Sequence, residues 1–515
     1  MKSLLQPCLA LTAGLAALSL TSCKEKEKKM SAKNILFICI DDLRTALPVY
    51  GESQLITPNI DWLATQSVLF DTHYCSVPFS GPSRASMWTG LYPTPDRFTN
   101  FARAQDLVPK VTVLPQFFKD QGYHTVSLGK VFHHGDDFAS AWDVLDKERN
   151  YFGYQDSANI RQQQIDQEIA RENISKIDFD DLAALPRDFQ APQGPAFECV
   201  DVPDEAYPDG QNTLRAIAEL EKAQSSGQPF FLAIGYYRPH APFMAPKKYW
   251  DMYDPATVGL TDNPDFPTTA PAEARQATQE LYMTLSGIPH YEDIPDSLAL
   301  KIRHGYYAGI SYTDAQIGKL MAAIDRLGLR ENTIVVLWGD NGYLLGEHEG
   351  WSKLSNFHEA MHVPFMISTP GYKGGRHSGS LTGSVDIYPT LCELAGFEAP
   401  SHAQGTSMVP VLKDPEAITH KAIFSRMNKG ISVRTPRYVY TEWAPSDSTK
   451  AKACMLYDLQ LDPEERVNIA LLEENKQLVA EMEGLIAAHE AEIARQDSEH
   501  DYGEPNPDMN TNPFE

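Results

Sequence analysis

The chain has 515 residues, 42% of them hydrophobic and 22% charged, so it is long enough for one large domain and a smaller one. This composition excludes a fibrous or disordered protein. A formal net charge of −25 at pH 7 argues against nucleic acid as a partner, because phosphate binding depends on clustered Lys and Arg. Any anion-binding pocket must therefore be built from local basic groups that oppose the field of the whole surface.

The first 32 residues have the features of an export signal followed by a tether. An apolar run over residues 9–20 is too short to span a bilayer comfortably, which predicts a signal peptide over residues 1–22. Leu-Thr-Ser-Cys at residues 20–23 resembles the lipobox of bacterial lipoproteins, in which Cys23 is acylated. Residues 23–32 would then be a charged tether, and the protein would be exported to the periplasm or cell surface, lipid-anchored to a bacterial membrane. An ordinary signal peptide with a chance cysteine is the alternative.

The cysteines give no sign of a disulfide-rich or zinc-binding protein. The spacings outside the first 32 residues match neither a dense disulfide framework nor a zinc site. We therefore expect mostly buried thiols, with at most one or two bridges, among Cys39, Cys75, Cys199, Cys392 and Cys454.

Short apolar segments alternate with helical patterns as far as about residue 410. Segments rich in β-branched and aromatic residues predict strands over residues 35–40, 125–128, 230–235, 333–338 and 364–368. Apolar periodicity predicts helices over residues 59–66, 113–121, 314–327 and 387–395. This alternation predicts an α/β fold in which helices cover both faces of the sheet.

Two stretches and the C-terminal part depart from this alternation. Residues 159–210 and 255–297 are rich in Pro, Asp and Ala, which predicts long irregular surface excursions. Beyond residue 410, isolated strands at 422–425 and 438–442 precede one long helix over about 464–495. We therefore expect a smaller C-terminal α+β subdomain over residues 411–515, with antiparallel strands, a long helix and a loose tail from Asp501 onward.

Four of the predicted strands run into polar residues. The segments that follow them are Asp41-Asp42, Gly129-Lys130 with His133, Arg238-Pro239-His240, and Asp340-Asn341. Each pair taken alone is more often a turn or a helix cap. Because ligands bind outside the carboxyl ends of strands in open α/β sheets, we expect these four segments to lie together.

The polar residues at the strand ends predict a divalent metal site beside an anion pocket. Hard oxygen ligands, which favour calcium or magnesium over soft metals and zinc, come from Asp41, Asp42, Asp340 and Asn341. A flexible cage with a neutral amide suits calcium better, although spacing alone leaves magnesium open. Basic groups for the anion pocket come from Lys130, His133 and His240.

The segment Ser80-Gly81-Pro82-Ser83-Arg84 predicts a helix start. Pro82 near the first helical position and Ser80 just before it are typical of a helix N-terminus, where free backbone N–H groups face an anion. Taken alone, the segment is more often a simple N-cap than an anion site.

The same segment carries a family resemblance. Ser80-x-Pro82-x-Arg84, with Thr89-Gly90 further on, resembles the motif of type I sulfatases, in which a Cys or Ser is converted to formylglycine. Other landmarks of that family follow the expected order: Asp41-Asp42, Gly129-Lys130-x-x-His133, Pro239-His240, Asp340-Asn341-Gly342 and Lys353. The resemblance implies an alkaline-phosphatase/sulfatase-like fold, with a large mixed sheet flanked by helices, a catalytic domain over residues 33–410 and a smaller C-terminal α+β subdomain.

Within that family the chain resembles the iduronate-2-sulfatase branch. The resemblance is carried by residues 41–44, 129–133 and 346–357. It implies removal of a 2-O-sulfate from a uronic acid in a sulfated oligosaccharide or polysaccharide. Two positions depart from the branch, since Asn341 stands where His is frequent and Tyr237 where another His is expected near the substrate.

The resemblance also implies a cofactor and a modification. One calcium ion would be held by Asp41, Asp42, Asp340, Asn341 and the formylglycine (3-oxoalanine) made from Ser80. A serine at this position implies conversion by the anaerobic radical sulfatase-maturating enzyme, which would be a partner of this protein.

The basic residues receive roles from the same resemblance. Lys130, His240 and Lys353 would grip the sulfate and stabilise or protonate the leaving oxygen. Arg84 would steady the formylglycine, and His133 would act as the base that allows sulfate to leave.

Two other functions remain open from the sequence. Other hydrolases of the alkaline phosphatase superfamily, such as phosphonate monoesterases and phosphodiesterases, share the acidic metal cage. A chain whose Ser80 is never modified would instead be a non-catalytic lipoprotein that binds sulfated glycans.

Overall fold

The computed structural model describes residues 33–52, 54–146, 151–176, 186–276, 278–445, 452–509 and 511. The predicted signal peptide (1–22), the tether (23–32) and the acylation site Cys23 lie outside the described residues. Within these described ranges, no helix combines the length and the apolar character needed to cross a membrane.

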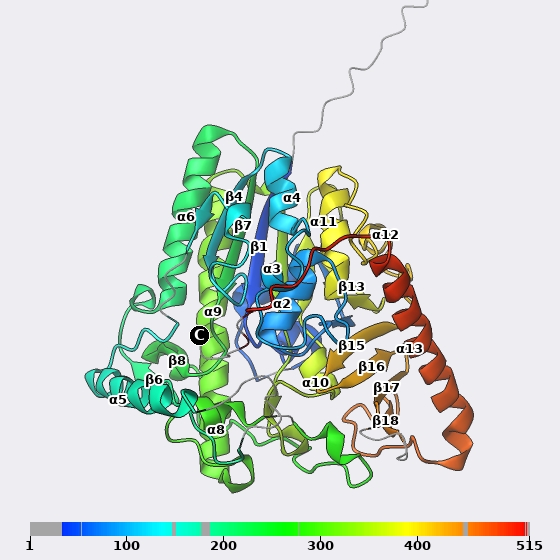
Figure 1. Ribbon diagram of the computed structural model, residues 1–515. Helices are drawn as coiled ribbons and strands as arrows, with labels where there is room; N and C mark the ends of the chain where they lie inside the picture. The colour runs from blue at the N-terminus through cyan, green and yellow to red at the C-terminus, as the bar shows by residue number, and fades with distance from the viewer. Residues whose placement is uncertain are drawn as a thin grey trace, which may run out of the picture. The chain divides into compact units, whose positions relative to one another are not determined.

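An eight-stranded mixed sheet forms the centre of the structure, in the order β13-β2-β12-β9-β1-β7-β4-β5 (Figure 1). The strands are β1 (Asn34–Ile40), β2 (Val68–Phe70), β4 (His124–Gly129), β5 (Val144–Leu145), β7 (Phe230–Tyr236), β9 (Thr333–Gly339), β12 (Phe365–Ser368) and β13 (Arg376–Ser378). The neighbours from β9 to β5 pair in parallel, whereas β12 is antiparallel to both β9 and β2. All five predicted strands are therefore confirmed, and so is the large mixed sheet.

Strand β1 shows why the sheet is covered on both faces. All seven of its residues are buried, and alternate side chains belong to two different hydrophobic clusters. On the side of Leu36 and Ile38 the cluster includes residues of α1 (Pro58–Thr65), α6 (Pro208–Ser226) and α9 (Asp296–Arg326). On the side of Phe37 and Cys39 it includes residues of α2 (Ser80–Thr89), α4 (Leu114–Asp120) and α11 (Ile387–Ala395). A strand that is apolar along its whole length is the consequence of this double covering.

Shorter elements complete the part of the chain before residue 414. The remaining helices there are α3 (Ala104–Leu107), α5 (Ser157–Ile174), α7 (Lys247–Trp250), α8 (Glu280–Thr284), α10 (His358–Met361) and α12 (Val409–Lys413). Three two-stranded sheets pair β3 (His73–Tyr74) with β14 (Thr382–Gly383), β6 (Phe197–Val200) with β8 (Phe243–Pro246), and β10 (Leu344–Leu345) with β11 (Trp351–Ser352).

The prediction of an irregular excursion over residues 159–210 was wrong for its beginning and its end, and residues 177–185 lie outside the described residues. Helix α5 fills its first part, strand β6 crosses it, and α6 begins at its end. Helix α5 lacks the apolar stripe that marks a packed helix, because its only buried residues are Asp166 and Ala170. Its start is instead marked by Asp156, whose side chain accepts hydrogen bonds from the backbone N–H groups of Ala158 and Asn159.

The predicted starts of two helices were also wrong. Helix α9 begins at Asp296, directly after Pro295, rather than at residue 314. Its first half carries buried apolar residues at helical spacing, so Pro295 and this spacing were the better signals, and Gly305 and Gly309 do not interrupt the helix. In the C-terminal part, residues 464–472 hold turns and a 3-10 turn covers Glu473–Asn475, so the long helix α13 is confined to Lys476–Asp497.

The C-terminal part forms a four-stranded antiparallel sheet packed on α13 (Figure 1). Its strands are β15 (Ile423–Met427), β16 (Gly430–Arg434), β17 (Tyr438–Trp443) and β18 (Ala453–Asp458). One face of the sheet packs on α13 through Met482 and Ile486. The opposite face contributes Val439 and Tyr457 to a cluster that also contains Phe357 of the larger part. The smaller C-terminal α+β subdomain is thus present and is buried on both faces.

The tail was predicted to be loose from Asp501 onward, and this is wrong for the first part of it. The backbone N–H of Lys110 donates to the carbonyl of Tyr502 at 3.0 Å, and that of Asn506 donates to the carbonyl of Asp106 at 2.7 Å. The five cysteines considered above, all of them described, are free thiols, and Cys199 is the exposed one. No bridge therefore forms among these five.

Candidate active site

Three aspartates from two neighbouring strands meet at one edge of the main sheet. Asp41 and Asp42 directly follow β1, and Asp340 follows β9, the parallel strand beside it. One carboxylate oxygen of each lies within 4.8 Å of the others, and all three side chains are buried. The expected meeting of these segments at the carboxyl ends of the strands is therefore present.

Ser80 lies at this acidic cluster as the first residue of α2. Its Oγ lies 3.0 Å from Asp41 Oδ1 and 3.0 Å from Asn341 Oδ1, so its single hydroxyl hydrogen is shared between these two acceptors. The Asn341 amide in turn donates from Nδ2 to Asp42 Oδ1 at 2.8 Å. The residue that the motif singles out thus contacts both strand ends, and the predicted helix start at this position is confirmed.

Each aspartate of the cluster is held by a different cation through its Oδ2 atom. Lys130 Nζ pairs with Asp41, Lys353 Nζ pairs with Asp42 at 2.9 Å, and Arg84 Nε pairs with Asp340 at 2.8 Å. The Oδ1 atoms of the three aspartates face Ser80, Asn341 or the backbone N–H of Asp42 and Asn341. Buried hard oxygens that converge in this way, with one amide oxygen among them, fit a calcium ion.

Burial and charge act in opposite directions on the titration of these groups. Burial alone would raise the pKa of Asp41, but Lys130, His240, Arg84 and Lys353 together hold it well below its ordinary value. Burial, with the charges of Asp41 and Asp42, raises the pKa of Asp340 to about 6 although Arg84 opposes this. Burial lowers the pKa of Lys130, whereas Asp42 and Glu280 outweigh burial at Lys353 and raise the pKa of that ammonium group.

His240 reaches the same cluster from the segment after β7. Its Nε2 lies 3.6 Å from Asp42 Oδ2 and 3.6 Å from Glu280 Oε1. Asp209 holds the turn that carries His240. Its carboxylate accepts hydrogen bonds from the backbone N–H groups of Tyr237 and Arg238, both at 2.9 Å. Tyr237 is itself buried.

His133 lies next to Gly81, the residue after Ser80. Its Cγ is 3.5 Å from the position that a Cβ atom on Gly81 would occupy, so the imidazole ring lies against the first turn of α2. Burial, reinforced by the charge of Lys130, holds the pKa of His133 well below its ordinary value. The ring is therefore neutral near pH 7 and offers a lone pair as a proton acceptor.

Two residues that the sequence did not single out belong to this site. Glu280 of α8 accepts a hydrogen bond from Lys353 Nζ at 2.8 Å and lies half-buried beside His240. The hydroxyl of Tyr151 contacts His240 Nδ1 and donates to the carbonyl of Ala241 at 2.6 Å. Glu280 lies in the stretch 255–297 that was predicted to be an irregular surface excursion, and nothing in its local sequence distinguishes it from the neighbouring acidic residues.

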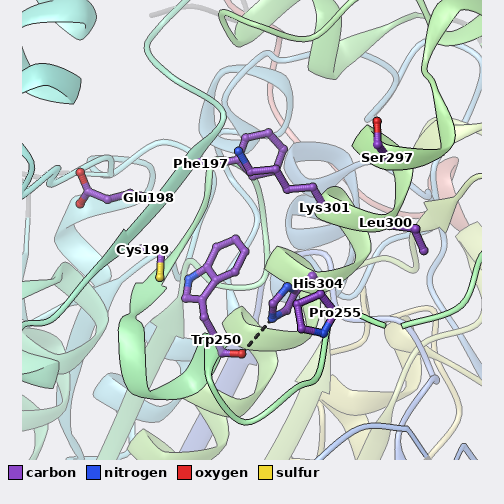
Figure 2. Close-up of a pocket in the computed structure, with 9 residues that line it drawn as sticks. All are labelled: Phe197, Glu198, Cys199, Trp250, Pro255, Ser297, Leu300, Lys301 and His304. Atoms are coloured by element: carbon purple, nitrogen blue, oxygen red, sulfur yellow. Dashed lines mark hydrogen bonds between the residues drawn. The ribbon is translucent and has the colours of Figure 1, made fainter. Parts of the chain in front are cut away.

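A separate cavity of about 600 Å³ lies between β6, α7 and the first turns of α9 (Figure 2). None of the residues of the acidic cluster lines it. Figure 2 shows the Trp250 ring and the His304 side chain facing this space, with the His304 Nε2 at 2.8 Å from the Trp250 carbonyl oxygen. The cavity is thus distinct from the site at Ser80.

Comparison with known proteins identifies the class first. The sulfatase family model matches residues 33–397, and the model of the N-sulphoglucosamine sulphohydrolase C-terminal region matches residues 346–492. The chain belongs to the sulfatase family and is a sulfuric ester hydrolase.

The particular branch follows from a curated relative. Iduronate 2-sulfatase of Mus musculus is 33% identical over 438 residues, which cover 77% of this chain and 74% of that protein. The chain is therefore a type I sulfatase close to the iduronate-2-sulfatase branch.

Two solved structures share the fold. A phosphonate monoester hydrolase of Agrobacterium radiobacter has a TM-score of 0.67 at 23% identity and covers 90% of this chain and 96% of its own. A 2-O GAG sulfatase has a TM-score of 0.64 at 21% identity and covers 94% of this chain and 96% of its own. These likenesses identify an alkaline-phosphatase/sulfatase-type fold.

Proposed function

We propose that this sulfatase removes a 2-O-sulfate from a uronic acid in a sulfated glycan, with calcium bound and with Ser80 converted to formylglycine. The observation that carries the proposal is the position of Ser80 Oγ, 3.0 Å from both Asp41 and Asn341 and next to the buried cations Lys130 and Lys353. The identity to iduronate 2-sulfatase supports the glycan and the 2-O position.

The oxygen set described above supports the calcium part of the proposal. Asp41, Asp42, Asp340, Asn341 and the converted Ser80 would hold the ion. When bound, it would supply positive charge that offsets the sulfate oxygens and lowers the pKa of the formylglycine hydrate.

The cations of the site bind and orient the sulfate ester. Lys130 and Lys353 are buried with positive charge directed at the acidic cluster, so they would contact the sulfate oxygens in a site with little water. His240 is placed to stabilise or protonate the leaving sugar oxygen. Arg84 is fully buried between Asp340 and Asp41, which suits the steadying of residue 80 rather than a contact with substrate.

His133 has the position and the protonation state of a base. Its neutral ring against the first turn of α2 would take the proton of the second hydroxyl on the residue at position 80, which allows sulfate to leave. An unmodified serine lacks that second hydroxyl, so the proposal requires conversion by the anaerobic radical maturase.

The test uses protein co-expressed with such a maturase and a panel of position-defined sulfated disaccharides. We expect sulfate release from 2-O-sulfated uronates, measured by ion chromatography, and a peptide spanning residue 80 that is lighter by the mass of about two hydrogens. A matched panel with 6-O- and N-sulfated sugars is the control. Sulfate release from the 6-O- or N-sulfated sugars alone would contradict the 2-O specificity and would leave the assignment as a sulfatase intact.

Two rival functions have their own readouts. Faster turnover of nitrophenyl phosphate than of nitrophenyl sulfate esters by the matured protein would favour a phosphonate or phosphate ester hydrolase, whose fold this chain shares. An unchanged Ser80 in protein from the native host, together with retained glycan binding, would favour the non-catalytic lipoprotein.

The proposal includes a lipid anchor at Cys23. It also divides the chain into a catalytic domain over residues 33–410 and a C-terminal subdomain over residues 411–515. The lipobox-like Leu-Thr-Ser-Cys segment supports the anchor. Fractionation of cells that express the full chain tests it: we expect the protein in the membrane fraction and the Cys23→Ser variant in the soluble fraction. Equal membrane recovery of both would contradict the anchor.

A further inference from the structure

A second cluster of potential metal ligands lies apart from the residues of the acidic cluster at Ser80. It consists of His348 in the 3-10 turn Glu347–Glu349, Glu359 of α10 and Glu465 after β18, and we call it the His-Glu-Glu cluster. One ligand atom of each residue lies within 4.8 Å of the others, and His348 Nε2 lies 3.8 Å from Glu359 Oε2.

Each member of the His-Glu-Glu cluster has a buried polar atom without a hydrogen-bond partner. These atoms are His348 Nδ1, Glu359 Oε2 and Glu465 Oε1. The Glu465 residue is 0% exposed and its other oxygen accepts the backbone N–H of His358 at 2.7 Å, so Oε1 is the part of this carboxylate that lacks a partner. Buried carboxylate oxygens are costly unless a cation or a proton neutralises them.

No Lys or Arg among the described residues forms an ion pair with Glu359 or Glu465. Arg44 pairs with Glu347 instead, and Arg434 donates from Nε to the Tyr74 hydroxyl at 2.8 Å. The two carboxylates therefore lie close together without an ion pair to Lys or Arg in this part of the structure. Arg434 acts on Glu465, and Arg44 interacts with Glu359, only through longer-range charge interactions.

The imidazole of His348 is held in one orientation by its neighbours. Its ring stacks on Phe357 with centroids 3.9 Å apart and an interplanar angle of 14°. Asn263 Nδ2 approaches His348 Nε2 at 3.4 Å while donating to the Glu464 carbonyl at 2.6 Å. Nε2 lies 3.8 Å from Glu359 Oε2, so a metal ion bound between these two atoms would replace the 3.4 Å contact of Nε2 with Asn263.

We propose that the His-Glu-Glu cluster binds a divalent transition metal ion, of the Zn²⁺ or Mn²⁺ class. One imidazole and two carboxylates suit these ions, whereas calcium prefers oxygen ligands alone. Ligand atoms about 2.0–2.2 Å from a common ion lie at most about 4.4 Å apart, so the His348–Glu359 separation fits as it stands. The other separations are at most 4.8 Å, so any adjustment needed to reach a common ion is no more than a few tenths of an ångström.

The ion would connect the two parts of the chain. His348 and Glu359 belong to the larger part, and Glu465 follows β18 of the C-terminal sheet. Occupancy is therefore expected to stabilise the packing of that sheet on the larger part, and the proposal goes beyond the function proposed for Ser80.

The experiment measures metal content and affinity in the full chain without using activity. Protein stripped by a chelator is dialysed against Zn²⁺ or Mn²⁺ alone, and the bound metal is counted by mass spectrometry. We expect about one equivalent that persists in an Asp340→Asn variant and whose affinity falls at least tenfold in Glu359→Gln and in Glu465→Gln. Anomalous scattering from wild-type crystals soaked in Zn²⁺ locates the ion independently of any variant.

Two results would overturn the proposal. One is unchanged metal binding in both Glu→Gln variants. The other is a wild-type protein that binds no transition metal while Glu465→Gln raises its melting temperature without metal, because a shared proton would then neutralise the two carboxylates.

Discussion

Residue 80 illustrates how a single side chain acquires its chemistry from its neighbours. A serine hydroxyl alone is a weak nucleophile. Here it starts a helix, contacts Asp41 and Asn341 and lies among Lys130, Lys353 and His133, none of which adjoins it in the chain. The motif around Ser80 marks the residue, and the ends of β1, β4 and β9 supply the setting.

Replacing Ser80 separates this chemistry from the stability of α2. We expect Ser80→Ala to lower kcat by about a thousandfold or more, because no formylglycine forms. The measurement is sulfate release by matured protein. Ser86→Ala is the matched control: Ser86 lies in the same helix and donates to the Leu91 carbonyl at 2.7 Å, so its loss removes a hydrogen bond but no reacting group. Comparable activity losses in both variants would contradict the role of Ser80.

Glu280 is predicted to be a positioning residue for Lys353. Its carboxylate and that of Asp42 hold the Lys353 ammonium group from two sides. We expect Glu280→Gln to lower kcat/KM about tenfold, because Lys353 then shifts toward Asp42 and away from the sulfate. The exposed Glu273, changed to Gln, is the control. Rescue by Glu280→Asp would support positioning, and a wild-type rate in Glu280→Gln would refute it.

At the scale of elements, the segment before α11 connects the larger part to the chain beyond α12. Asp386, at the end of a 3-10 turn, accepts hydrogen bonds from the backbone N–H groups of Gly383 and Thr406 at 2.8 and 2.7 Å. His420 Nε2 lies 2.9 Å from Asp386 Oδ2. One buried carboxylate thus fixes a helix start and two segments distant in sequence.

This contact makes part of the stability depend on pH. Burial lowers the pKa of His420, but its hydrogen bond and charge interaction with Asp386 outweigh burial and raise it above the ordinary value. A raised folded-state pKa contributes stability that is complete below the unfolded value of about 6.5 and is lost as pH rises through the folded value.

Urea unfolding of wild type and His420→Gln measures this contribution. We expect wild type to be more stable by about 1 kcal/mol near pH 6, with a smaller difference near pH 8.5. His377→Gln is the control, since His377 is exposed. A difference that grows with pH would have the wrong sign.

At the scale of the whole chain, the C-terminal sheet is buried on both faces. Val439, Trp443 and Tyr457 pack against Phe357 and Met361 of the larger part, while α13 covers the other face. The chain beyond residue 410 is therefore a part of one core and not an appended module.

Truncation at residue 410 tests this dependence. We expect residues 33–410 expressed alone to be insoluble or to bind a hydrophobic dye, because removal of the sheet exposes the apolar side chains of Phe357, Met361 and Leu381. Residues 33–509 are the control. A soluble and active fragment 33–410 would contradict the prediction.

The sequence by itself determined five of the eight strands of the main sheet, the polar pairs Asp41-Asp42 and Asp340-Asn341 after two of them, and the residue at the start of α2. Those features depend on neighbours in the chain: a buried strand is a continuous apolar run, and the Ser80 motif and the two polar pairs each occupy a few consecutive residues. Polar α5 was missed because an apolar stripe was the helix signal, and α5 has none. The early start of α9 was missed although its first half carries apolar residues at helical spacing after Pro295.

Only the tertiary structure decided which distant residues complete each site. Glu280 and Tyr151 reach His240 and Lys353 from excursions without any distinguishing motif, and Glu465 joins His348 and Glu359 from another part of the chain. Such contacts follow from how sheets and loops pack. The residues in contact are many positions apart in the chain, so no short sequence motif indicates that they meet.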